Sequence, residues 1–102
     1  MIDVIRELAA QNQLRITRHA RNEMDADAIT TDDLLRGLSA WDCVLIEDYP
    51  GDARGHSHLV LSWLDAGQPI HVCCALHENE LVIITVYRPD GNLWRDDWRT
   101  RT

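Results

Sequence analysis

The chain has 102 residues, of which 45% are apolar, and a length that suits a single domain (1–102) whose core needs no disulfide, metal or other cofactor. No apolar stretch approaches the ~18 residues that span a bilayer, and no basic segment followed by an apolar run opens the chain, so we expect a cytoplasmic protein without membrane contact. The net charge of −7 argues against a general nucleic-acid binder, because phosphate neutralisation supplies most non-specific affinity.

Apolar residues at helical spacing predict three helices in the first forty residues. The first covers residues 3–11, where an apolar stripe alternates with polar positions. The second begins after Thr17, which is expected to be its N-cap, and ends in the polar D-A-D stretch. The third begins at Thr30, with Asp33 placed as in a capping box.

The remainder of the chain predicts antiparallel strands joined by short turns. β-branched residues crowd between Leu81 and Arg88, and they suit a pleated, buried surface better than a helix. Two-residue turns are expected at residues 66–67 and 78–79. The strands are expected at residues 43–49, 58–63, 70–77 and 81–88. This order predicts an α+β fold in which N-terminal helices pack on a four-stranded antiparallel sheet.

Both hairpins assign the same residues to the same sheet face, which predicts the register as well as the strands. The face toward the helices is expected to carry Leu59, Leu61, Trp63, Ile70, Val72, Cys74, Leu76, Leu81, Ile83, Thr85 and Tyr87. The second face is mixed in polarity and is expected to form a cleft; it would carry His58, Val60, Ser62, His71, Cys73, Ala75, His77, Val82, Ile84, Val86 and Arg88. Cys73 and Cys74 would point to opposite faces, so the three cysteines are expected to be buried and unpaired.

All ten basic residues are arginines, and seven of them fall into two clusters. One cluster is Arg15, Arg18 and Arg21; the other crowds the C-terminal end, at Arg88, Arg95, Arg99 and Arg101. Such asymmetry in an acidic chain predicts one basic groove, although solvated helix faces give similar counts.

Several segments together resemble a known family. They are I-T-R-H-A-R-N-E-M, I-T-T-D-D-L, L-I-E-D-Y-P, P-I-H-V-C-C-A-L, L-V-I-I-T-V-Y-R-P and W-R-D-D-W-R, between residues 14 and 99. They resemble a small bacterial domain family of unknown function that is often encoded beside a YgiT-type zinc-finger antitoxin and is related in fold to the RelE, MqsR and BrnT toxins. The resemblance implies a RelE/barnase-like fold and a type II toxin that is a metal-independent endoribonuclease, often cutting mRNA on the ribosome. It also implies a cognate antitoxin as partner.

Cleavage of RNA needs a proton acceptor, a proton donor and a cation on the phosphate. The candidates are His19, His71, Tyr87 and Arg88. His19 matches the family's helix-opening histidine and has arginines on both sides, but it would also pair with Glu23 on a solvated helix face. His71 is expected opposite Ser62 and diagonal to Arg88. Tyr87 is equally consistent with a core residue whose hydroxyl reaches the rim.

Phosphate and base contacts are expected from Arg15, Arg18, Arg21, Trp94 and Arg95. Trp94 and Trp98 also suit a short helical turn that covers the core. His56 and His58 have a spacing that metals use on a strand, but no carboxylate or thiolate completes a recognisable set, so no metal site is expected. Two hypotheses remain: a RelE-like ribonuclease toxin, and a non-catalytic RNA- or protein-binding module that kept the fold.

Overall fold

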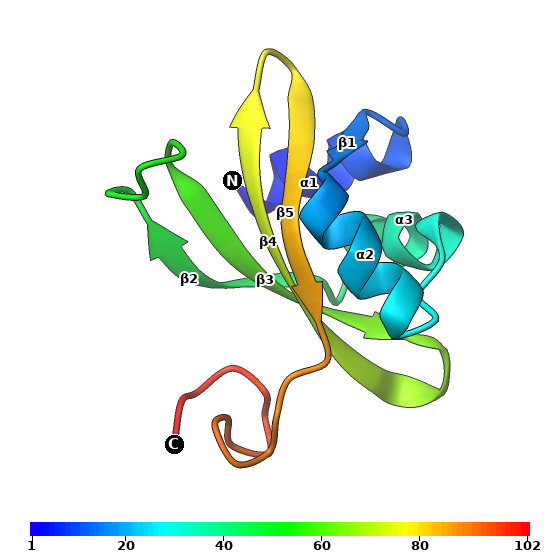
Figure 1. Ribbon diagram of the computed structural model, residues 1–102, viewed down its shortest axis with the longest axis vertical. Coiled ribbons are helices and arrows are strands. Elements are labelled where there is room, and N and C mark those ends of the chain that lie inside the picture. Colours follow the sequence, from blue (N-terminus) through cyan, green and yellow to red (C-terminus); the bar gives the residue numbers. More distant parts are fainter.

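Three helices cover one face of a five-stranded mixed sheet (Figure 1). The computed structural model describes residues 1–102. Its elements are α1 (Ile2–Ala10), β1 (Leu14–Ile16), α2 (Arg18–Ala26), α3 (Thr31–Ser39), β2 (Val44–Tyr49), β3 (Ser57–Leu64), a 3-10 turn η1 (Asp65–Gly67), β4 (Gln68–His77) and β5 (Glu80–Tyr87). None of the helices combines the length and apolarity needed to cross a lipid bilayer.

The sheet has one strand more than expected. Its order is β1-β5-β4-β3-β2, and β1 pairs with β5 in parallel, with Leu14 beside Leu81 and Ile16 beside Ile83. The α+β class is therefore confirmed, whereas the prediction of a purely antiparallel four-stranded sheet is wrong. A strand of three residues leaves almost no periodic signal, and its partner lies at the far end of the chain.

Two of the helices begin at the predicted caps. The Thr17 hydroxyl accepts a hydrogen bond from the Ala20 amide at 3.1 Å, and Thr30 and Asp33 form a reciprocal capping box. Each cap satisfies amides that the first helical turn leaves without partners. The Thr17 hydroxyl also donates to the Ile84 carbonyl at 3.2 Å, so the cap fastens α2 to β5.

The β4–β5 hairpin follows the predicted register only near its turn. Glu78 and Asn79 both have positive φ, as a two-residue type I′ turn requires, and His77 pairs with Glu80. A β-bulge then shifts the ladder by one residue, between the Cys74–Ile83 and Cys73–Thr85 pairs.

Beyond the bulge, side chains exchange faces relative to the prediction. Val86 enters the helix-covered core, while Thr85 and Tyr87 lie opposite Cys73 and His71 on the second face.

The β3–β4 hairpin is shifted throughout. Its connection has three residues, Asp65–Gly67, so Val60 pairs with Val72 and Leu61 pairs with His71. Val60 consequently belongs to the helix-covered core, and Leu61 moves to the second face. The prediction that His71 lies opposite Ser62 is wrong, because Ser62 pairs with Ile70 and its hydroxyl faces Gly37 of α3.

The main core lies between the sheet and the helices, as predicted for Val72, Cys74 and Ile83. Its strand residues are Val60, Ile70, Val72, Cys74, Leu81, Ile83 and Val86, and its helix residues are Ile5, Ala9, Ala20, Met24, Leu34 and Leu38. Burial of each large apolar side chain contributes about 1.5–3 kcal/mol. The three cysteines are free and buried, as expected.

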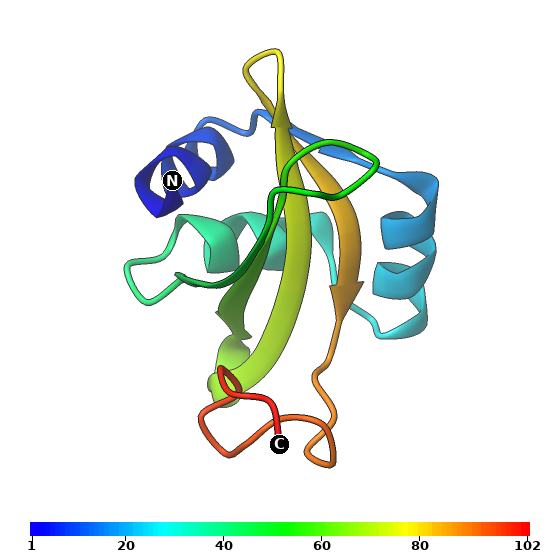
Figure 2. The ribbon, with the colours of Figure 1, turned by 90° about the vertical axis from the view of Figure 1, so that its left-hand side faces the viewer.

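The second face carries a smaller apolar cluster that the C-terminal segment covers at one end (Figure 2). Trp94 is only 3% exposed and packs with Leu59, Cys73 and Ile84, which confirms its expected role as core cover. The predicted helical turn is absent, because this segment instead forms turns and an isolated bridge between Trp94 and Arg101.

Candidate functional site

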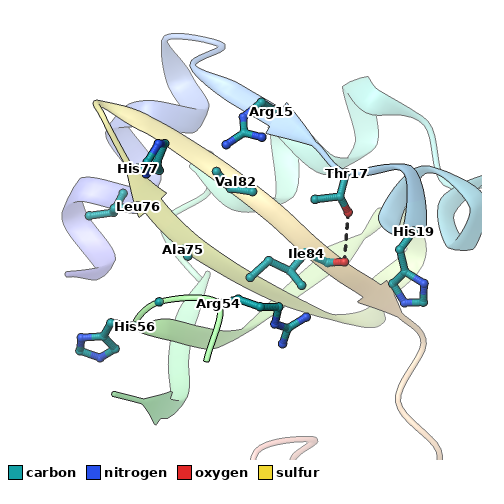
Figure 3. A pocket seen from close by; sticks show the side chains of 11 residues that line it. Arg15, Thr17, His19, Arg54, His56, Ala75, Leu76, His77, Val82 and Ile84 are labelled. Atoms are coloured by element: carbon teal, nitrogen blue, oxygen red, sulfur yellow. Dashed lines mark hydrogen bonds between the residues drawn. The ribbon is translucent and has the colours of Figure 1, made fainter. Parts of the chain in front are cut away.

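The largest pocket lies on the second face, beside the β4–β5 turn (Figure 3). It has a volume of about 520 Å³ and combines an apolar floor from the sheet with polar walls from β1, the start of α2 and the β2–β3 loop. Its lining residues are Arg15, Thr17, His19, Arg54, Gly55, His56, Ala75, Leu76, His77, Val82 and Ile84. The predicted cleft on the mixed face is therefore present, and Ala75, His77, Val82 and Ile84 were all assigned to that face.

The lining of this pocket, hereafter the basic pocket, contains two arginines and three histidines but no carboxylate. Arg15 has one weak acidic neighbour, Glu80, at 3.7 Å, and both side chains are about half exposed. In a chain with net charge −7, this is a local concentration of cationic and protonatable groups. The chemistry of the pocket suits an anionic ligand.

His19 lies in the first turn of α2 with its side chain 69% exposed at the pocket. Its Nε2 is 3.3 Å from Oε1 of Glu23, the pairing that the helical spacing indicated. The same carboxylate oxygen accepts a hydrogen bond from the Val86 amide of β5 at 2.9 Å. Because β5 fixes Glu23, the imidazole of His19 is oriented by a carboxylate that is itself held in place.

Arg54 reaches the pocket from the β2–β3 loop, which Asp52 organises. The Asp52 carboxylate accepts hydrogen bonds from the Arg54 amide at 2.9 Å, the Arg54 guanidinium at 3.0 and 3.1 Å and the Ser57 hydroxyl at 2.7 Å. These bonds, with those from the Arg54 guanidinium foremost, hold the pKa of Asp52 well below its usual range. The loop is thereby fixed in the shape that brings Arg54 to the pocket.

His71 and Tyr87, both predicted catalytic residues, are brought together but away from the basic pocket. His71 is fully buried, with Nδ1 at 3.0 Å from the Tyr87 hydroxyl and Nε2 at 2.7 Å from the Trp98 carbonyl. Because a carbonyl only accepts, Nε2 carries the proton, and the Tyr87 hydroxyl then donates to Nδ1 of the neutral ring. Burial lowers the pKa of His71 and raises that of Tyr87. This geometry fastens the C-terminal segment to the sheet and gives a ligand no access to the imidazole.

The predicted arginine groove is dispersed. Of Arg15, Arg18, Arg21 and Arg95, only Arg15 lines the basic pocket. Arg21 donates to the Thr31 hydroxyl at 3.0 Å and so bridges α2 to α3.

Arg88 also has structural partners. It donates to the Gln68 side chain at 2.8 Å and to the Asp27 carbonyl at 3.0 Å, and it borders a different, shallower pocket. The trio of His71, Ser62 and Arg88 expected from the sequence does not form.

Three basic or protonatable residues of the basic pocket, Arg54, His56 and His77, were not among the predicted catalytic and RNA-binding residues. His77 was placed on the correct face by its strand alternation, and its exposure at the end of β4 was the signal that would have selected it. Arg54 lies in an irregular loop, where no periodicity relates it to the sheet.

One further group has the composition of metal ligands. Asp48, His56 and His58 offer one carboxylate oxygen and two imidazole nitrogens, all within 4.8 Å of one another. No carboxylate lies at a suitable sequence spacing from the two histidines. Pairing of β2 with β3 supplies one, because Asp48 lies opposite His58.

A family model described as a domain of unknown function (DUF4258) matches residues 16–88. The match includes every residue of the basic pocket except Arg15, and it leaves out α1 and the C-terminal segment. No curated protein matches the chain, and no solved structure does either.

Proposed function

Since the chain belongs to the DUF4258 family of domains of unknown function, we propose a function from its own site: the basic pocket binds RNA, and the protein is a metal-independent endoribonuclease of the RelE-like toxin type. One observation carries the proposal. In a chain with net charge −7, the largest pocket is lined by Arg15, Arg54 and three histidines without a carboxylate. Phosphate would be attracted to these five groups, each of which also has a carboxylate neighbour outside the lining, at 2.7 to 3.9 Å.

The chemistry assigned to the pocket is attack of a ribose 2′-hydroxyl on the adjacent phosphorus. The P–O2′ bond forms, the P–O5′ bond breaks, and the products are a 2′,3′-cyclic phosphate and a 5′-hydroxyl. His19 takes the 2′-hydroxyl proton, with Glu23 orienting its ring, and the leaving oxygen is protonated by water. Arg15 and Arg54 stabilise the charge that develops on the phosphoryl oxygens.

A toxin of this type would need a partner that closes the site until it is required. The proposed partner is a cognate antitoxin, encoded beside it, whose acidic or extended segment covers the basic pocket. An mRNA, free or on the ribosome, is the proposed substrate, and its unpaired strand would lie on the sheet face where the pocket opens.

RNA binding is tested by fluorescence anisotropy over a series of salt concentrations. The Arg15→Ala and Arg54→Ala variants are each expected to weaken binding for all sequences and to reduce the salt slope by about 1. Arg36→Ala is the matched control, because Arg36 is an exposed arginine of α3 that borders a different pocket. Equal loss in all three variants, or in none, would remove the basic pocket from consideration.

Cleavage is tested with His19→Ala on labelled RNA, with and without ribosomes. Loss of one positioned base costs about 10²- to 10⁴-fold in rate, while RNA binding and the circular dichroism spectrum should stay near those of wild type. Persistent cleavage by a correctly folded His19→Ala chain would assign the proton transfer to another group.

A second candidate, a non-catalytic RNA- or protein-binding module, is favoured by the full burial of His71, whose imidazole is bonded to the half-buried Tyr87. Only His19 of the sequence-derived proton-transfer candidates lines the basic pocket. Binding that depends on Arg15 and Arg54, without cleavage of any RNA by the wild type, would decide for this candidate.

A further inference from the structure

Three side chains converge where the β2–β3 hairpin begins to open. Asp48 of β2 lies directly opposite His58 of β3, and His56 precedes β3 by one residue. Oδ1 of Asp48 is 2.7 Å from Nε2 of His56 and 2.6 Å from Nδ1 of His58. The two imidazole rings are 4.5 Å apart between centroids and tilted by 35°. Two ring nitrogens and one carboxylate oxygen therefore lie within 4.8 Å of one another.

His58 has a donor-acceptor atom that the protein itself does not satisfy. Its side chain is only 4% exposed, and Nδ1 is buried without a hydrogen-bond partner. The Asp48 oxygen is close, at 2.6 Å, but the angles at this contact are not those of a hydrogen bond. Buried polar atoms without partners are rare in folded proteins, and a bound ion or water is one physical explanation for such an atom. The orphan nitrogen lies within 4.8 Å of the ligand atoms of Asp48 and His56.

We propose that Asp48, His56 and His58 bind a divalent transition-metal ion, with zinc as the expected occupant. Two imidazoles and one carboxylate form a common ligand set for zinc, and imidazole nitrogen disfavours calcium and magnesium, which take oxygen ligands. With bonds of about 2.0–2.2 Å, tetrahedral ligand atoms lie about 3.3 Å apart. The distances from Oδ1 of Asp48 to the two imidazole nitrogens, 2.6 and 2.7 Å, therefore need to increase by less than about 1 Å.

The side chains around the site allow that adjustment. Asp48 and His56 are half exposed, at 49% and 50%, and have room to move, whereas His58 is held by burial. Three protein ligands leave at least one coordination position for water, which faces solvent at this edge of the sheet. His56 also lines the basic pocket, but no step of the proposed RNA chemistry uses Asp48, His56 or His58, so the two proposals can be tested separately.

The proposed ion would also bridge the two ends of the β2–β3 loop. His56 is separated by one residue from Arg54, which lines the basic pocket. An ion bound to Asp48 and His56 would fix the loop in addition to the hydrogen bonds of Asp52. Metal binding is thus expected to stabilise the fold and to limit movement of Arg54.

Zinc binding is measured by calorimetry on tag-free protein dialysed against EDTA and then freed of chelator. We expect one ion per chain with affinity in the micromolar range or tighter. Cobalt(II) is the second probe, and it should give the visible absorption of a tetrahedral nitrogen and oxygen site without thiolate charge-transfer bands. At a hundredfold excess of zinc over Kd, Tm should rise by about 10 °C.

Asp48→Asn and His56→Gln test the site without touching its buried member. Each is expected to weaken zinc binding by more than about tenfold while the far-UV circular dichroism stays unchanged. His77→Gln is the matched control, because His77 is an exposed histidine beside an acid, at 3.9 Å from Glu78, and is not among the three ligands. The proposal is overturned if millimolar zinc and cobalt give neither heat nor absorption, or if His77→Gln weakens binding as much as the other two variants.

Discussion

Replacement of His71 by alanine is expected to release the C-terminal segment from the sheet. The imidazole donates to the Trp98 carbonyl, accepts from the Tyr87 hydroxyl and packs edge-on against Trp94, with centroids 4.4 Å apart. These are the contacts that a structural role requires, and a catalytic role would need access that full burial denies. The prediction therefore separates the two roles that the sequence left open for this residue.

The expected cost follows from these contacts. Each polar partner left without its hydrogen bond costs about 1–3 kcal/mol, and loss of the aromatic contact adds about 0.5–1.5 kcal/mol. With two such partners, His71→Ala should therefore lower the free energy of unfolding by about 3–7 kcal/mol. Tyr87→Phe removes only one of the hydrogen bonds and should cost about 1 kcal/mol, or about 4–8 °C in Tm.

The burial of His71 also predicts a pH dependence. Its pKa in the folded state lies below the ordinary value of 6.5, because desolvation penalises the imidazolium. Below about pH 6.5 the unfolded chain therefore binds more protons than the folded one. The contribution of neutral, buried His71 to the free energy of unfolding is fully present above about pH 6.5 and is lost as the pH falls toward the lowered pKa. His71→Gln should remove this loss.

Urea unfolding followed by tryptophan fluorescence measures both effects, and near-UV circular dichroism reports the packing of Trp94. The pH series runs from 8 to 5, above the range in which carboxylates such as Glu47 and Asp52 titrate, since their pKa values are lowered. The reasoning is refuted if His71→Ala unfolds within 1 kcal/mol of wild type. It is also refuted if His71→Gln keeps the wild-type slope between pH 6.5 and 5.

Three other predictions concern packing and reactivity. A Cβ on Gly37 would lie 2.5 Å from the Ser62 hydroxyl but 3.6 Å from the Ser62 Cβ. Gly37→Ala alone should therefore lower the free energy of unfolding in urea by about 1–3 kcal/mol. In a Ser62→Ala background the same substitution should be neutral or stabilising, because the clashing hydroxyl is gone. Ser62→Ala alone should not destabilise, because its buried hydroxyl has no partner. Arg6 donates to three carbonyls within residues 40–43, so Arg6→Ala should lower stability by about 2–4 kcal/mol and Arg6→Lys should restore only part of it, as thermal melts would reveal. Burial raises the pKa of Cys43 to about 12, so a thiol reagent at pH 8 should leave Cys43 unmodified in the native chain and modify it in urea; rapid native labelling would contradict the burial.

Local chemistry made much of the fold predictable. Thr17, Thr30 and Asp33 are caps whose hydrogen bonds lie within one helical turn, so the sequence around each is sufficient to identify it. The turn at Glu78 and Asn79 fixes the β4–β5 register in the same local way, as far as the bulge between Cys73 and Cys74. The predicted β3–β4 register is wrong because Asp65 belongs to the turn. One added turn residue moves the side chains of β3 to the opposite sheet face from the one predicted.

The candidate site was only partly predictable, because most of it is made by non-local contacts. Alternation along β4 and β5 placed Ala75, Val82 and Ile84 on the mixed face, and that face holds the basic pocket. No local pattern predicts that the β2–β3 loop brings Arg54 to the same place. Asp48 likewise lies opposite His58 only because β2 pairs with β3, and the register of that pairing was not predicted from the sequence.

The parallel pairing of β1 with β5 has a kinetic consequence. The bond from Thr17 to the Ile84 carbonyl joins residues 67 positions apart, whereas the β4–β5 hairpin closes over two. Closure entropy grows with loop length, so the hairpins should form early and the docking of β1 and α2 should come late. Segments that dock late through few contacts also tend to open first, and hydrogen exchange should give the amides of β1 lower opening free energies than those of β4. That late segment includes Arg15, Thr17 and His19, which form one wall of the basic pocket. This wall would therefore open and close slowly relative to the hairpins.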